Sequence, residues 1–215
     1  STRYASSAAS DVYKRQIDTI NKLRAKNLDD DAFIKKFSDI FKENKMESIS
    51  EGTFFSSILF ISALDETNKI ETFLEKFENA ESPQMQGRYR AVLGQVRDQN
   101  ASKKIVEFML DGRIRGADCP YILASMITNK YIGKKSWKVI KENFNDLLSV
   151  MPDWTASRIL DALPAIYDEE FADDIKNFIK KNPLPSSEKL AAQKLERLEA
   201  NIEFMDNLKE VNNET

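Results

Sequence analysis

Three charged residues, Arg115, Asp118 and Arg158, are the best candidates in the sequence for contact with a substrate. Arg115 and Asp118 lie between two expected helices, where the arginine could hold a substrate carboxylate by two parallel hydrogen bonds. Two structural explanations compete: the two residues pair with each other, or Asp118 caps the helix near Pro120. Arg158, just inside a later helix, could point to the concave face of a helical array, or could pack against neighbouring backbone.

Two further pairs of residues have ordinary structural explanations. Trp137 and Trp154 could form an aromatic pair that binds peptides, but tryptophans at helical spacing are more often core residues. Glu142 and Asp146 lie four residues apart, so like-charge repulsion could favour acid chemistry. They belong to the polar face of an expected helix. We therefore expect both tryptophans in the core and both acids on the surface.

The chain contains no histidine and only one cysteine, Cys119. A hydrolytic zinc site normally takes two or three imidazoles, and a Ser-His-Asp or Cys-His arrangement needs at least one. The sequence therefore predicts no catalytic residue, no metal ligand and no cofactor in this chain. An enzyme that uses only carboxylates is possible in principle, but no pair of acids lies on an apolar background.

Charge and hydropathy exclude two classes of partner. The 32 basic and 35 acidic residues give a formal net charge of −3, which is unsuited to neutralising phosphates, so we expect no nucleic acid. The sequence has no run of about 18 apolar residues, so we expect no membrane span. One cysteine permits no internal disulfide, which favours a reducing compartment, and we expect a cytoplasmic location.

The segment Trp137–Met151 predicts the helix around which the other elements are organised. Its apolar residues recur at steps of three, four or seven and share one face: Trp137, Ile140, Phe144, Leu147, Leu148 and Met151. Such a helix is stable only when its apolar face packs on neighbours. The same analysis predicts helices at about 17–25, 29–44, 50–64, 67–79, 85–96, 101–110, 117–128, 136–151, 154–166, 168–181 and 186–208.

From residue 67 onward these helices form pairs that recur about every 34 residues. Helix pairs at that spacing are typical of stacked repeats, in which each pair buries its face against the next. We therefore predict an all-α fold, a HEAT-like α-solenoid of antiparallel helix pairs with about 10–11 helices. An irregular helical bundle is the alternative.

The sequence predicts one helical domain at 17–209, flanked by two tails. Residues 1–16 lack a helical stripe and resemble translated sequencing-adaptor read-through, although a natural flexible tail fits equally well. We set this segment aside and expect the natural chain to continue upstream of Ile17. Residues 210–215 are expected to form a disordered tail.

The second half of the chain resembles the C-terminal domain of the aminopeptidase N and puromycin-sensitive aminopeptidase family, zinc metallopeptidases of the gluzincin group. The family pattern begins with a Trp-x-x-hydrophobic-Lys-Glu-Asn-aromatic helix and a Ser-Arg-hydrophobic-hydrophobic segment. A phenylalanine-rich helix, a proline-rich turn and a long helix with Gln-x-x-Glu follow. The matching residues are Trp137, Lys141, Glu142, Asn143, Phe144, Ser157, Arg158, Ile159, Leu160, Phe178, Pro183, Pro185, Gln193, Glu196, Leu198 and Asn201.

An upstream segment resembles the same family. Its matching residues are Leu93, Gly94, Gly112, Ile114, Arg115, Asp118 and Pro120. Ala117 stands where the family usually has glutamine, which puts a role for that side chain in doubt. The resemblance extends from about Tyr89 to Leu208, and residues 17–88 are compatible with it in length and helical character.

The resemblance implies a non-catalytic, HEAT-like domain packed beside a thermolysin-like catalytic domain of the same polypeptide. Its concave side would cover the active-site cavity, control the entry of peptide substrates and contact the far end of the substrate. In the family the Gly-Ala-Met-Glu-Asn motif and the zinc-binding His-Glu-x-x-His helix lie upstream, and neither is present here. Zinc would therefore belong to the catalytic domain. The alternative is a free-standing helical-repeat scaffold that binds protein partners.

Overall fold

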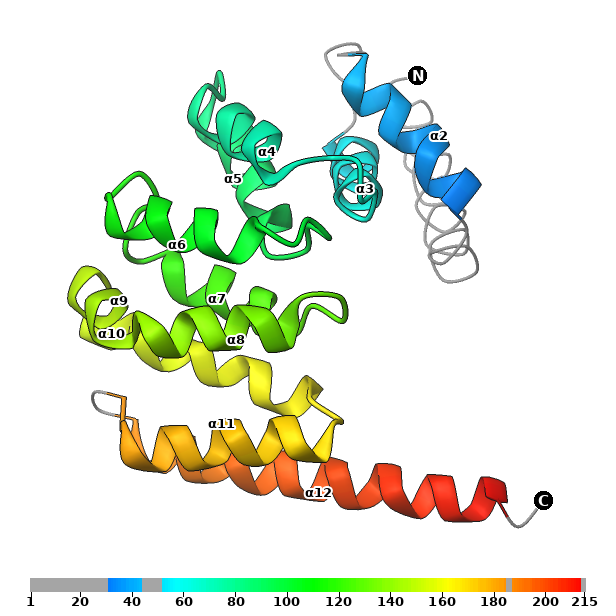
Figure 1. Ribbon diagram of the computed structural model, residues 1–215. Coiled ribbons are helices and arrows are strands. Elements are labelled where there is room, and N and C mark those ends of the chain that lie inside the picture. The colour runs from blue at the N-terminus through cyan, green and yellow to red at the C-terminus, as the bar shows by residue number, and fades with distance from the viewer. Residues whose placement is uncertain (1–30, 44–51, 185–186, 214–215) are drawn as a thin grey trace, which may run out of the picture. The chain divides into compact units, whose positions relative to one another are not determined.

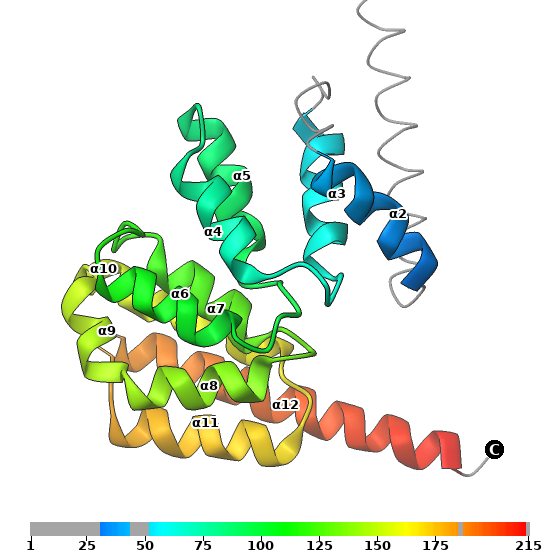
Figure 2. The same ribbon diagram turned by 45° about the horizontal axis from the view of Figure 1, so that its top comes forward.

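The computed structural model describes residues 31–43, 52–184 and 187–213, and within these ranges the chain is all helical (Figures 1 and 2). The described residues form eleven α-helices and one 3-10 helix and contain no strand, which confirms the predicted all-α class. The chain divides into two compact units, Ser1–Asp98 and Gln99–Thr215, which are treated separately below.

The described part of the first unit has four helices, of which α3 is the most apolar. Helix α3 packs against both α2 and α5, as its uniformly hydrophobic sequence predicts, and α4 packs against α5. Phe41 of α2 stacks on Phe73 of α4 with ring centroids 4.9 Å apart, and both side chains are fully buried. The four helices are α2 (Asp31–Lys42), α3 (Gly52–Ala63), α4 (Ile70–Glu78) and α5 (Pro83–Leu93).

The second unit consists of helices that pack against one another in several layers of contacts. Helix α6 contacts α8 and α9, α7 contacts α8 and η2, and η2 contacts α12. Figures 1 and 2 show α8 between α6 and α11, with α12 running alongside α11 and beyond its end. The elements are α6 (Ala101–Leu110), α7 (Cys119–Ile127), α8 (Gly133–Glu142), α9 (Phe144–Val150), α10 (Asp153–Ala156), η2 (Ser157–Ala165), α11 (Glu169–Lys181) and α12 (Glu188–Asn213).

The prediction of one continuous helix over 136–151 is wrong, because the chain breaks at Asn143. This residue has φ −116° and ψ 17°, and its side-chain amide donates to the carbonyl of Val139 at 2.8 Å. Asparagine competes with the helical hydrogen-bond ladder in this way. The predicted apolar face nevertheless survives, since Trp137, Phe144 and Leu147 are buried on the two shorter helices, α8 and α9.

The predicted α-helix over 154–166 is also wrong in type. The segment forms one short turn, α10, and then the 3-10 helix η2, which contains Pro164. Proline lacks the N–H that an α-helix would use, and the tighter 3-10 winding changes which residues share a face. Ile159, Leu160 and Leu163 remain buried as the sequence predicts.

The limits of α12 differ from those of the predicted helix at 186–208. Helix α12 continues to Asn213, so helix extends beyond the boundary that we expected at residue 209. The predicted helix at 17–25 and the segment 1–16 lie outside the described residues. The domain limits 1–16, 17–209 and 210–215 stay predictions.

Candidate functional site

Arg115 and Asp118 form a two-pronged ion pair in the segment between α6 and α7. Arg115 Nε donates to Asp118 Oδ2 and Nη2 donates to Oδ1, each at 3.1 Å. This hydrogen bonding and the charge of Asp118 raise the pKa of Arg115. The mutual ion pair considered in the sequence analysis is therefore present, and in this arrangement Asp118 occupies the fork that a substrate carboxylate would need.

The capping role considered for Asp118 is wrong at the level of its side chain. Asp118 occupies the N-cap position of α7, but with φ −93° and ψ −22° its side chain makes no capping hydrogen bond. Its carboxylate is directed to Arg115 instead. The arginine side chain is 74 % exposed, whereas that of Asp118 is 16 % exposed, so the pair has one solvated partner and one sheltered partner.

Two glycines shape the segment that bears this ion pair. Gly112 has φ +72°, a conformation that glycine adopts without strain, and it follows the end of α6. At Gly116 an added Cβ would lie only 2.1 Å from the carbonyl oxygen of Val150. The chain therefore needs glycine there so that the backbone can lie against the end of α9. The side chain of Ile114, only 1 % exposed, anchors the same segment.

Arg158 lies on η2 and has a carboxylate partner of its own. Its Nη1 is 3.8 Å from Asp161 Oδ2, and Lys194 Nζ of α12 is 2.8 Å from the other oxygen of Asp161. The Arg158 side chain is 52 % exposed, so the packed arginine considered in the sequence analysis is not observed. Arg115 and Arg158 thus pair with different carboxylates on different elements, and the structure identifies no shared site for them.

The two tryptophans have opposite environments. Trp137 is 2 % exposed and makes an edge-to-face contact with Phe178, which confirms its core position. Trp154 is 75 % exposed, so the prediction that it is a core residue is wrong. The physical reason is the short α10 helix followed by 3-10 winding, which buries Thr155 and Ala156 and leaves Trp154 on the outer side.

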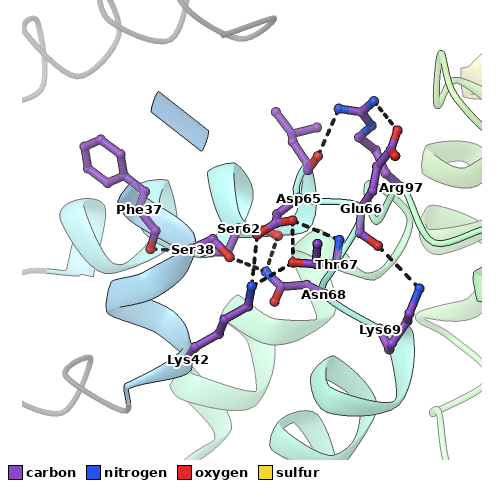
Figure 3. Close-up of polar contacts among 11 residues, drawn as sticks. Phe37, Ser38, Lys42, Ser62, Asp65, Glu66, Thr67, Asn68, Lys69 and Arg97 are labelled. Carbon is purple, nitrogen blue, oxygen red and sulfur yellow. Dashed lines mark hydrogen bonds and ion pairs between the residues drawn. The ribbon is translucent and has the colours of Figure 1, made fainter. Parts of the chain in front are cut away.

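A polar cluster that the sequence analysis missed lies in the first unit and is centred on Asp65 (Figure 3). Its carboxylate accepts hydrogen bonds from Lys42 Nζ at 3.1 Å, from the Thr67 backbone N–H at 2.9 Å and from the Thr67 hydroxyl at 2.7 Å. Burial raises the pKa of Asp65, but hydrogen bonds from Ser38, Thr67 and Lys42 outweigh it and hold the pKa well below its usual range. The carboxylate is thus fixed in its ionised form.

Hydrogen bonds link this cluster to helices α2 and α3 of the first unit. Asn68 donates to the Ser38 hydroxyl of α2 and to the Ser62 carbonyl of α3, both at 2.8 Å. Arg97 donates to the Leu64 carbonyl at 3.2 Å and pairs with Glu66. A pocket of about 320 Å³ is lined by Lys42, Asp65, Glu66, Thr67 and Arg97, among other residues. Because its acids and bases already pair with one another, the cluster holds the α3–α4 connection in place through polar contacts.

The described residues provide neither a readily ionised thiol nor a cluster of metal ligands. Burial, with a smaller effect of the Asp118 charge, raises the pKa of the Cys119 thiol to about 12, so this sulfur is a poor nucleophile at neutral pH. Among the described residues there is no group of three or more Cys, Asp or Glu side chains placed to hold a metal ion. Within the same residues no helix is long and apolar enough to cross a bilayer.

Comparison with known protein families gives the strongest assignment. The family model named ERAP1-like C-terminal domain matches residues 4–200, which includes most of the N-terminal segment that the sequence analysis set aside. The match therefore extends well upstream of Tyr89, where the sequence resemblance became clear. It agrees with the resemblance to the C-terminal domain of the aminopeptidase family. Because the match covers most of the chain, this protein belongs to the ERAP1-like C-terminal domain family.

Proposed function

We propose that this chain is the non-catalytic C-terminal domain of a zinc aminopeptidase, where it covers the active-site cavity and controls the access of peptides. The family match over residues 4–200 is the observation on which the proposal depends. The all-helical fold and the lack of histidine agree with a domain that surrounds a catalytic centre without supplying its ligands.

The helix pairs support a HEAT-like solenoid as the architecture of this domain. The first helices of successive pairs begin at residues 70, 101, 133 and 169, so about 31–36 residues separate them. Hydrogen bonds within the second unit join residues at a similar distance in sequence: Ser102 with Ser136, Lys134 with Asp168, and Trp137 with Asp174. Stacked repeats make such contacts between each pair and the next.

The partners in this proposal are the catalytic domain of the same polypeptide and the peptide substrates. The zinc ion would be held by that catalytic domain, because the described residues offer no suitable set of ligands. Arg158 is the stronger candidate for a substrate contact, since its carboxylate partner is 3.8 Å away, whereas Arg115 makes two hydrogen bonds of 3.1 Å to Asp118. Arg115 and Asp118 would have to exchange their mutual hydrogen bonds for a substrate. We place the assembled enzyme in the cytoplasm, as the single cysteine favours.

The upstream reading frame gives the most direct test of the proposal. We expect it to encode, in phase with residue 1, a Gly-Ala-Met-Glu-Asn motif and a His-Glu-x-x-His helix. An upstream region that encodes neither motif would overturn the aminopeptidase assignment. It would favour the free-standing protein-binding scaffold, which the exposed aromatic side chain of Trp154 also suits.

A functional test compares the catalytic region alone with the same region joined to this chain. The isolated chain should not hydrolyse aminoacyl fluorogenic substrates. Joined to the catalytic region, it should change the ratio of kcat/KM for a ten-residue peptide to that for an aminoacyl substrate, because a covering domain acts on long substrates more than on short ones. An unchanged ratio would show that the domain does not control access.

A further inference from the structure

A pocket of about 500 Å³ opens in the second unit, where the α7–α8 connection faces the η2–α11 connection. It lies apart from the candidate residues described above, since Arg115, Asp118 and Arg158 are not among its lining residues. The lining residues with charged or aromatic side chains are Lys130, Tyr131, Lys134, Lys135, Tyr167, Asp168 and Phe171.

The charged groups of this pocket are mainly positive. Three lysines line it, and Asp168 is the only carboxylate among its lining residues. Lys134 Nζ lies 2.7 Å from Asp168 Oδ2, and this hydrogen bond raises the pKa of Lys134. Lys130 lies over the ring of Tyr131, with Nζ 4.8 Å from the centroid. At neutral pH the lining therefore has an excess of positive charge, although the chain as a whole is negative.

Helix stability does not explain why these lysines are where they are. Lys134 and Lys135 lie in the first turn of α8, and this turn contains no acidic residue. Cations are unfavourable there because the peptide dipoles make the start of a helix positive. By contrast, α11 begins with Glu169 and Glu170 and ends with two lysines, as stability favours. Asp168 already offsets this cost for Lys134. The charge of Lys135 has a cost at the helix start that an anionic ligand would offset.

The same pocket has an apolar component beside the lysines. Ile132 and Ile166 are buried in its wall, and Phe171 is half-buried. The aromatic ring of Tyr167 is 53 % exposed at the pocket. A large exposed aromatic side chain next to ammonium groups is suited to ligands that combine apolar and anionic groups.

We propose that this pocket binds an acidic peptide segment, with side-chain carboxylates at the lysines and an apolar side chain between Tyr131 and Tyr167. The presence of three separate lysines among the lining residues favours several side-chain carboxylates over one terminal carboxylate. Lys130 lies within the α7–α8 connection and Lys134 and Lys135 lie in the first turn of α8, and each presents a compact point charge. A single terminal carboxylate is better matched by the two-pronged fork of one arginine, and no arginine lines the pocket.

This inference goes beyond the proposed function and depends on the pocket alone. Its test therefore uses the 215-residue chain and no catalytic assay, so that failure of either proposal leaves the other intact. The probe is a fluorescein-labelled peptide with blocked termini and the internal sequence Glu-Asp-Phe-Glu-Leu, titrated by fluorescence anisotropy at low salt. We expect saturable binding that weakens as salt rises, since exposed ion pairs are screened.

Two further peptides identify the group that is recognised. The Gln-Asn-Phe-Gln-Leu analogue should bind at least about tenfold more weakly, because it keeps the shape and loses the charges. A neutral peptide with a free terminal carboxylate should also bind weakly. Equal binding of the neutral analogue, preferred binding of the free terminus, or no binding of the acidic peptide would each overturn the proposal.

Variants of the chain then locate the binding surface. The double substitution Lys130→Gln and Lys135→Gln should weaken binding of the acidic peptide by about three- to tenfold, the range expected for loss of two exposed ion pairs. The matched control is Lys103→Gln with Lys138→Gln, two exposed lysines outside the pocket. It removes the same charge and should leave most of the affinity. Thermal melts of both variants test their folding, and an equal loss of affinity in the two would overturn the proposal.

Discussion

The indole N–H of Trp137 donates a hydrogen bond to Asp174 Oδ2 at 3.0 Å, which fixes a core residue of α8 to a carboxylate of α11. Lys141 Nζ lies 2.8 and 2.6 Å from the two oxygens of the same carboxylate. Phe178 packs edge-to-face against Trp137 from the same helix as Asp174. Polar and aromatic contacts thus fix the position of α8 relative to α11.

We expect Asp174→Ala to lower the free energy of unfolding by about 1–3 kcal/mol, because it leaves the sheltered Trp137 N–H without its acceptor. Urea unfolding followed by tryptophan fluorescence measures the change. The control is Asp173→Ala, whose carboxylate forms an exposed ion pair with Lys176 at 3.0 Å and should contribute less than about 1 kcal/mol. Equal losses in the two variants would show that the indole hydrogen bond has no special importance.

Two glycines should respond to alanine in opposite directions. Gly116→Ala should destabilise the chain by about 1–3 kcal/mol, because its new Cβ would lie 2.1 Å from the backbone oxygen of Val150 and force a local shift. Gly87→Ala should stabilise it by about 0.5–1 kcal/mol, since Gly87 is inside α5 and its Cβ would meet no atom within 4 Å. Chemical denaturation measures both, and a stable Gly116→Ala variant would contradict the close approach.

The helix order and most of the core could be predicted from the sequence, because both depend on local periodicity. The helix Ala101–Leu110 has the predicted bounds, and α11 begins one residue after the predicted start because Asp168 accepts a capping hydrogen bond from Phe171 N–H. The break at Asn143 was missed because an asparagine within a strong apolar stripe can either continue a helix or interrupt it. The hydrogen bond from its side chain to the Val139 carbonyl, which the sequence does not reveal, accompanies the break.

The candidate site depended on contacts that sequence spacing does not specify. Arg115 and Asp118 are three residues apart, so their ion pair could be anticipated. Lys42 lies 23 residues from Asp65, and Asp174 lies 37 residues from Trp137. Such pairings follow from how helices stack. Trp154 was misassigned for a related reason. Its exposure depends on the 3-10 winding that follows it, and apolar spacing does not distinguish a 3-10 helix from an α-helix clearly.

Asp65 should make the stability of the chain depend on pH in the acid range. Its pKa in the folded protein lies below the ordinary value of 3.8, so the folded state binds this proton less readily than the unfolded state. Its stabilising contribution is therefore fully present above about pH 4 to 5 and is lost as pH falls through the folded pKa. We expect the difference in unfolding free energy between the natural chain and Asp65→Asn to be constant from pH 7 to pH 5 and to shrink below.

Urea titrations of both proteins at each pH isolate this effect, because the other acidic groups are common to the two chains. A second variant, Lys42→Met, tests the cause. It removes one of the hydrogen bonds that lower the pKa of Asp65 and leaves those of Thr67 and Ser38. It should reduce the pH dependence only partly. A difference between the natural chain and Asp65→Asn that stayed constant down to pH 3 would contradict the low pKa.

Cys119 should be almost inert to thiol reagents in the folded chain. Burial is the main cause of its raised pKa of about 12, and against an ordinary value of 9.0 this lowers the thiolate fraction at pH 8 about a thousandfold. The side chain is also fully buried against Ile114 and Arg115, whose carbonyls lie 3.9 and 3.6 Å from its sulfur. Reaction with 5,5′-dithiobis(2-nitrobenzoate) should therefore be slow in buffer and complete within seconds in urea.

Because the chain has one cysteine, the slow rate reports opening of the α6–α7 region, and Gly116→Ala should accelerate it. Rapid labelling of the native chain would show that this region is open to solvent, and a rate unaffected by Gly116→Ala would show that the glycine does not hold it closed.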